Sequence, residues 1–313
     1  MILGDNERFM LKCEVTINSH PKDAPNISLL SCIPILMQRF KENNVLYEVN
    51  NGRAGVAITG IEDDDEFVKF LFHYANKDAS DPAFSDLKKG KTRVEKKKEG
   101  EGLSCTSHLI IKKTPRDKLL PNSYEAILEE VPSVTRTLLS NALTSLLNID
   151  SFRFDRKRKN GGKNLKCRPI IIIDLLAAST LEQSLSIGYL CGLTAVRSYT
   201  QKTLDANGVI SIDEEMIKMS CNARQGKGAM AAIKTAYDEL RGRHYGTLRI
   251  SLKDQNKRTT TENIKIDKAM TLAELAVAQL AKREKALLAT PIATCQTSFH
   301  AELIEKMKKY MLK

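Results

Sequence analysis

Eight lysine and arginine side chains lie in the segment Arg153–Arg168, and this density of positive charge is the chemistry that the sequence offers most clearly. Asp155 is the only acid in the segment, which leaves a net charge of +7 over sixteen residues. Cations at this density repel one another unless a polyanion neutralises them, although a solvated loop that only keeps the protein soluble is the alternative. The glycine pair 161–162 indicates a flexible turn, so we expect a basic hairpin or loop whose second arm enters the apolar segment 169–178.

Two further windows of sequence share this excess of cations. The window 88–98 holds seven cations and one acid, and the window 224–258 holds nine cations and three acids. Because the whole chain of 313 residues carries a formal charge of only +11, the residues outside the three windows are net negative. Solubility alone does not require such a separation of charge, so we predict a surface that binds nucleic acid.

The segment 222–228, NARQGKG, precedes a helix expected over 229–240 and is a second candidate site. A glycine-rich, cationic helix start presents free backbone N–H groups and the positive end of the helix dipole, which suits a phosphate. The G-x-x-x-x-G-K-[ST] pattern of nucleotide-binding loops is absent, so a backbone phosphate of nucleic acid is the expected ligand, with a plain flexible helix start as the alternative. The predicted nucleic-acid-binding residues are Arg156, Lys157, Arg158, Lys159, Lys163 and Lys166 in the first site, and Arg224, Lys227, Lys234, Arg241 and Arg243 in the second.

Aromatic residues make up only 5% of the chain, and tryptophan is absent. Proteins that bind single strands stack bases on aromatic side chains, and Phe152 and Phe154 are the only aromatics that lie among the cations of the segment Arg153–Arg168 or beside it. This favours duplex DNA held by its phosphates, with little preference for sequence and a steep dependence on salt.

The acidic residues do not form the pattern of a metal site. Residues 63–66, DDDE, are consecutive, and consecutive side chains diverge in a strand and scatter around a helix, so a solvated turn is the simpler interpretation. Asp78, Asp81 and Asp86 fit turns of a long loop equally well. A metal-dependent nuclease or an RNA-processing protein, whose acids converge only in the fold, remains an alternative.

The cysteines and histidines predict no cofactor and no metal. Seven cysteines without a CxxC pair and five scattered histidines indicate neither a disulfide framework nor a zinc site. His73 and His108 lie in two expected strands, where we favour packing over catalysis. No apolar run approaches the roughly 20 residues of a membrane span and the N-terminus has no signal pattern, so we expect a cytoplasmic protein.

Strand and helix patterns alternate along both halves of the chain, and together they predict the α+β class. We expect two lobes, each a mostly antiparallel sheet with packed helices: residues 1–150, and residues 151–313 with the basic loop 153–168. The first lobe is expected to hold strands 9–18, 67–75 and 103–113, helix 27–41, a hairpin closed at Asn50–Gly52, and linking helices 124–130 and 134–147. The second is expected to hold a strand at 170–173 buried on both faces, strands 247–252 and 260–266, and helices 229–240, 272–288 and 299–311.

The second half of the chain contains, in order, the expected helix KGAMAAIKTAYDEL, the strands GTLRISLKDQ and TTENIKIDKA, and the helix TLAELAVAQLAKREKALL. In these elements it resembles the RexA-type phage-exclusion proteins of lambdoid prophages. The resemblance covers mainly residues 165–290, and the basic run 156–166 has no counterpart in it. The resemblance implies a two-lobed, homodimeric DNA-binding protein without catalytic residues, which senses phage intrusion and works with a membrane partner.

Charge and resemblance together predict a DNA-binding protein of bacterial antiphage defence that recognises double-stranded DNA by its phosphates. Besides the nuclease, one alternative from another class is an interaction subunit that docks its basic patches on an acidic protein or a membrane partner.

Overall fold

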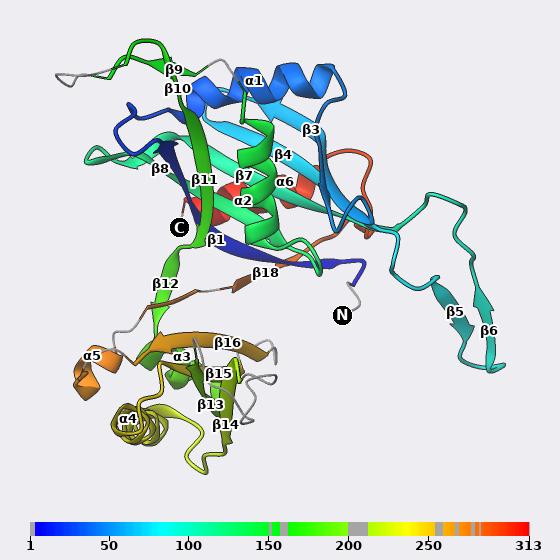
Figure 1. The fold of residues 1–313 in the computed structure, drawn as a ribbon. Helices are drawn as coiled ribbons and strands as arrows, with labels where there is room; N and C mark the ends of the chain where they lie inside the picture. Colours follow the sequence, from blue (N-terminus) through cyan, green and yellow to red (C-terminus); the bar gives the residue numbers. More distant parts are fainter. Residues whose placement is uncertain are drawn as a thin grey trace, which may run out of the picture. The chain divides into compact units, whose positions relative to one another are not determined.

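A computed structural model describes residues 4–149, 152–156, 162–199, 212–253, 259–266, 269–276, 279–281 and 283–312. Helices make up 23% of the structure and strands 44%, and this composition confirms the α+β class. The chain forms two compact units, labelled by element in Figure 1. Unit 1 comprises Met1–Leu176 and Arg283–Lys313, and unit 2 comprises Ala177–Lys282.

The units divide the chain at residue 176 and not at residue 150, where the sequence placed the boundary. The reason is strand pairing, because the segment 168–175 is a strand that pairs antiparallel with the first strand of the protein. The chain also returns to unit 1 after residue 282. The basic segment Arg153–Arg168 therefore belongs to the N-terminal unit.

An eight-stranded antiparallel sheet forms the centre of unit 1, in the order β11-β1-β8-β7-β4-β3-β2, with β18 also paired to β1. The strands are β1 (Glu7–His20), β2 (Leu46–Val49), β3 (Ala54–Asp63), β4 (Phe67–Asn76), β7 (Leu103–Asp117), β8 (Leu120–Glu130), β11 (Arg168–Leu175) and β18 (Arg283–Leu287).

Helices cover both faces of this sheet (Figure 1). Alternate side chains of a strand point to opposite faces, so Leu109 and Ile111 of β7 pack in one hydrophobic cluster and Ile110 in another. The first cluster contains helices α1 (Leu29–Lys41) and α2 (Arg136–Leu146), and the second contains α6 (Ala301–Met311). Side chains of Ser28, Thr135 and His300 cap the N-termini of these helices.

Three local predictions are wrong. Residues 124–130 form part of strand β8 rather than a linking helix, because β8 lies between β1 and β7 and exchanges hydrogen bonds with both. Residues 272–288 form the short helix α5 (Leu272–Ala276) and two strands, the second of which is β18. The strand at 170–173 is buried on one face only, because Ile171 and Ile173 are buried while Ile172 is 37% exposed.

Unit 2 contains a four-stranded antiparallel sheet covered by helices. Ile233 and Tyr237 of helix α4 (Gly226–Gly242) pack against Leu248 and Ile250 of the sheet in a separate hydrophobic cluster. The sheet order is β14 (Glu214–Met219), β13 (Tyr189–Ser198), β15 (Thr247–Lys253) and β16 (Thr259–Lys265). The unit also contains helix α3 (Leu181–Ile187) and the paired strands β12 (Ala177–Thr180) and β17 (Gln279–Ala281).

None of the helices that the structure describes combines the length and the apolar character of a membrane-spanning segment.

Glu302 in the first turn of α6 should give unit 1 a dependence on acid pH. Its carboxylate accepts hydrogen bonds from the backbone N–H groups of Thr290 and Ala289, which lower its pKa from 4.5 to about 2. A carboxylate whose pKa is lower in the folded protein than in the unfolded chain stabilises the fold at pH values above the pKa of the unfolded chain. This stabilisation is lost as the pH falls through the pKa of the folded protein. We therefore expect Glu302→Gln to lower the melting temperature at pH 6, and the difference from wild type to shrink between about pH 4.5 and pH 2. A difference that stays constant over this range would contradict the assignment.

Candidate nucleic-acid interface

The cationic windows lie in two different units. The window 88–98 and the segment Arg153–Arg168 belong to unit 1, and the window 224–258 belongs to unit 2. Lys157, Arg158 and Lys159 lie outside the described residues. The other eight predicted binding residues are described, and they lie on a hairpin of the segment Arg153–Arg168, in helix α4 (Gly226–Gly242) or directly beside that helix.

The hairpin of β9 (Arg153–Phe154) and β10 (Leu165–Lys166) carries the predicted binding residues of unit 1 that the structure describes. Phe154 and Cys167 are buried in the first hydrophobic cluster and fix the base of the hairpin to the core. The backbone N–H of Cys167 donates to Phe152 at 3.0 Å, and that of Arg156 donates to Gly162 at 2.9 Å. The segment is therefore a hairpin attached to a folded unit, as the sequence predicts.

Arg156 and the lysines of this hairpin differ in their surroundings. The Arg156 guanidinium donates to both carboxylate oxygens of Asp23, at 2.6 and 3.3 Å, so its charge is partly neutralised. Lys163 and Lys166 have exposed side chains. A cavity of about 650 Å³ beside the hairpin is lined by Asp23, Pro25, Arg153, Phe154, Asp155 and Asn164. The lining holds the carboxylates of Asp23 and Asp155 and the guanidinium of Arg153, so it carries no excess of positive charge for a small anion.

Helix α4 carries a row of cations along one side. Lys227, Lys234 and Arg241 are seven residues apart, and residues at this spacing differ by only about 20° around an α-helix. At a rise of about 1.5 Å per residue, the row is about 20 Å long. The side of the helix that packs on the sheet consists of Ala229, Met230, Ile233, Tyr237 and Leu240.

Not all cations of α4 have the same freedom to bind a ligand. Lys234 forms an ion pair with Asp238, and Arg243 lies 3.8 Å from Glu239. Arg224, Lys227 and Arg241 are exposed and have no acidic partner among the residues that the structure describes. The N-terminus of α4 has no side-chain cap and no acid in its first turn. Two of the three unpaired cations therefore lie next to uncapped backbone N–H groups.

The acids that a nuclease would need are used in turns and ion pairs. Asp64 caps the turn between β3 and β4, since its carboxylate accepts from the backbone N–H groups of Glu66 and Phe67. Burial raises the pKa of Asp64, but these two N–H groups and Lys69 outweigh it and hold the pKa below its ordinary value. Lys113 pairs with Asp63 at 3.1 Å. The described part of the chain contains no group of three or more side chains that could hold a metal ion.

The acids of the long loop behave in the same way. Asp78 accepts from Arg53 at 2.7 Å, Asp81 from the backbone N–H of Lys97 at 3.2 Å, and Asp86 from the backbone of the next turn. Each carboxylate holds the local backbone or a neighbouring cation, as expected of turn residues.

Comparison with family models, curated proteins and solved structures finds no match to this chain. The resemblance to RexA-type proteins therefore remains a prediction.

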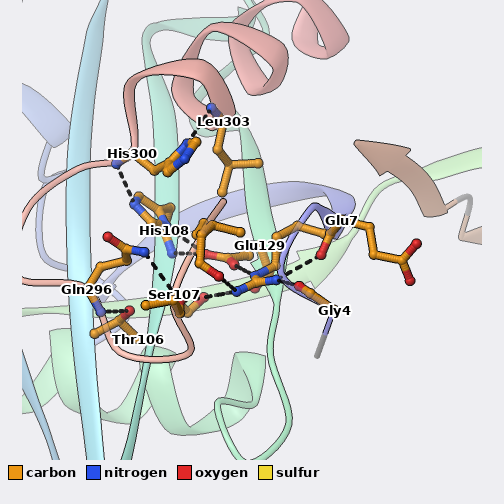
Figure 2. Close-up of polar contacts among 12 residues, drawn as sticks. Gly4, Glu7, Thr106, Ser107, His108, Glu129, Gln296, His300 and Leu303 are labelled. Carbon is orange, nitrogen blue, oxygen red and sulfur yellow. Dashed lines mark hydrogen bonds and ion pairs between the residues drawn. The ribbon is translucent and has the colours of Figure 1, made fainter. Parts of the chain in front are cut away.

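Sequence reasoning missed a buried polar network in unit 1, which Figure 2 shows. Glu129 of β8 lies 2.8 Å from the Arg8 guanidinium and 2.6 Å from Nδ1 of His108. Nε2 of His108 accepts the backbone N–H of His300 at 3.2 Å, so the proton of a neutral ring lies on Nδ1 and is donated to Glu129. His300 in turn accepts the N–H of Leu303 and caps α6.

This network holds the C-terminal segment against the sheet of unit 1. His108 is fully buried, and Arg8 also donates to the carbonyls of Ile292 and Ala293, at 2.9 and 3.1 Å. His73 lies opposite Thr106 in the sheet and does not face His108. His108 is thus a buried, hydrogen-bonded residue of the sheet. No spacing in the sequence signals the network, because its members come from distant strands.

Proposed function

We propose that this protein binds double-stranded DNA through its phosphates, with little preference for sequence. The observation that supports this best is the row of cations on α4, in which Lys227 and Arg241 are exposed. Arg224 is also exposed and lies just before the N-terminus of this helix. A row about 20 Å long suits an extended polyanion better than a single small anion. The exposed Lys163 and Lys166 of the β9–β10 hairpin provide a second set of cations.

The wider role is proposed from the resemblance of residues 165–290 to RexA-type proteins. On that basis we propose a cytoplasmic homodimer that acts in bacterial antiphage defence together with a membrane partner. The polarised charge of the chain supports the DNA part of this proposal and is independent of the resemblance.

A binding series with duplex DNA, single-stranded DNA and RNA tests the proposal. We expect duplexes of unrelated sequence to bind equally, with affinity falling by about a thousandfold or more between about 50 and 200 mM salt. We also expect no cleavage when Mg²⁺ or Mn²⁺ is added. The proposal is wrong if duplex DNA does not bind the protein at low salt. It is also wrong if the protein binds anionic vesicles or an acidic protein and duplex DNA does not displace them. Metal-dependent cleavage would favour the nuclease instead.

A further inference from the structure

Residues 77–102 connect strand β4 to strand β7 of unit 1 and form an arm. Strands β4 and β7 themselves are direct neighbours in the sheet. The two strands of the arm, β5 (Ala83–Asp86) and β6 (Lys91–Val94), pair antiparallel, with Phe84 opposite Arg93. Figure 1 shows this pair as a ribbon that extends away from the sheet of its unit. Every residue of both strands is exposed. A two-stranded hairpin without a buried face is only marginally stable in water, so a ribbon of this kind gains most from a surface that it lies against.

The side chains of the arm define the charge of that surface. Five lysines have no acidic partner within the described chain: Lys88, Lys89, Lys91, Lys96 and Lys98. Arg93 pairs with Glu95 at 2.5 Å, and its guanidinium lies 5.0 Å from the ring centre of Phe84. Within the arm, the stretch 88–98 holds seven cations and one acid, so it repels a second copy of itself and is complementary to an anionic surface.

The tip of the arm is an ordered turn. The carboxylate of Asp86 accepts the backbone N–H groups of Lys88 and Lys89 at 2.9 and 3.1 Å. Gly90, with a φ of +62°, donates its N–H to the Asp86 carbonyl at 2.8 Å. These contacts hold Leu87 at the end of the arm, where it is 97% exposed and followed by two lysines. An apolar side chain so placed has no partner within its own hairpin.

The base of the arm is fixed to unit 1. Lys77 donates its backbone N–H to the carbonyl of Arg53, just before β3, at 2.8 Å. Within the arm, Lys97 donates its backbone N–H to Asp81 at 3.2 Å and its ammonium group to the Lys77 carbonyl at 2.9 Å. At Gly102 a Cβ atom would lie 2.7 Å from the backbone of Asn76, so only glycine permits this close approach. These contacts make the arm an ordered hairpin with a fixed base.

We infer that the β5–β6 arm lies in the major groove of duplex DNA. This inference rests on the proposed function and adds the groove as the place of contact. The major groove is about 12 Å wide and admits a two-stranded ribbon, whereas the minor groove is only about 6 Å wide. The phosphates on either side of the groove pair with the five lysines, and Leu87 lies against base edges, where thymine methyl groups offer an apolar contact.

Methylation by dimethyl sulfate tests the groove, because this reagent modifies N7 of guanine, an atom exposed in the major groove. The full-length protein should protect guanine N7 in duplexes of unrelated sequence. The triple substitution Lys88→Gln, Lys89→Gln and Lys91→Gln should abolish this protection, lower duplex affinity about tenfold and reduce the slope of log affinity against log salt by about three. Leu87→Ser should reduce the protection and leave the salt slope unchanged, because the leucine carries no charge.

The matched control removes the same charge from exposed positions outside the three windows, as Lys41→Gln, Lys118→Gln and Lys309→Gln. The melting temperatures of all variants should equal that of wild type, because every changed side chain is exposed. The inference is overturned if the wild type binds duplex DNA with guanine N7 still reactive, or if the arm triple and the control bind alike. It is also overturned if the arm triple changes self-association and not DNA binding. The proposed function survives these three outcomes, whereas a wild type that fails to bind duplex DNA at low salt rejects the proposed function and the inference together.

Discussion

Glu129→Gln should lower the free energy of unfolding by about 3–5 kcal/mol. The Glu129 carboxylate is almost completely buried between the Arg8 guanidinium, at 2.8 Å, and Nδ1 of His108, at 2.6 Å. Glutamine has the same size but no charge, so the variant leaves the cation of Arg8 buried without a counter-ion. Removing one partner of a buried pair is costly because the other keeps its desolvation penalty.

The loss should extend to the C-terminal segment. Arg8 holds the carbonyl of Ile292, and His108 accepts the N–H of His300 at the start of α6. Both side chains owe their positions to Glu129, so the variant should also expose the amides of residues 292–304 to faster hydrogen exchange.

Urea unfolding of the variant and of a matched control measures this effect. Glu125 lies on the same strand and pairs with Lys12 at 2.7 Å, but both of these side chains are partly exposed to solvent. Glu125→Gln should therefore cost less than about 1 kcal/mol. If the two substitutions destabilise the protein equally, the buried network does not fasten the segment as described.

Elements with a strong local signal were predictable from the sequence. The hairpin at Asn50–Gly52 is one example, since all three residues adopt a positive φ there. Helix α1 is another, with leucine and isoleucine at helical spacing after Ser28. Strands β8 and β18 were not predictable, because segments such as YEAILEE and REKAL consist largely of good helix formers. Pairing with β1 overrides that preference, and the partner residues lie far away in the sequence.

The candidate site shows the same division between local and distant information. The charge density of the sequence identifies the cations, and the seven-residue spacing of Lys227, Lys234 and Arg241 is visible in the sequence itself. The contact of Arg156 with Asp23 spans 133 residues, and that of His108 with the backbone of His300 spans 192. No pattern along the chain encodes such contacts, so neither the neutralised arginine nor the buried network was predictable.

Reversing the unpaired cations of α4 should lower the affinity for duplex DNA about a hundredfold, equally for all sequences. The variant is Arg224→Glu, Lys227→Glu and Arg241→Glu, chosen because these exposed side chains have no acidic partner in the part of the chain that the structure describes. If each cation neutralises one phosphate, the slope of log affinity against log salt should fall by about three. Lys234 is left in place because its ion pair with Asp238 links it to the fold of the helix.

A control of equal charge separates a local interface from a general effect of net charge. The substitutions Lys41→Glu, Lys118→Glu and Lys309→Glu alter three exposed positions of unit 1 and change the net charge by the same amount. Long-range attraction acts through the whole charge of the protein and is screened by salt within about 10 Å. It should therefore weaken binding in both variants at low salt, whereas direct phosphate contacts are lost only in the α4 variant. Equal affinities and equal salt slopes for the two variants would exclude α4 as the surface that contacts DNA.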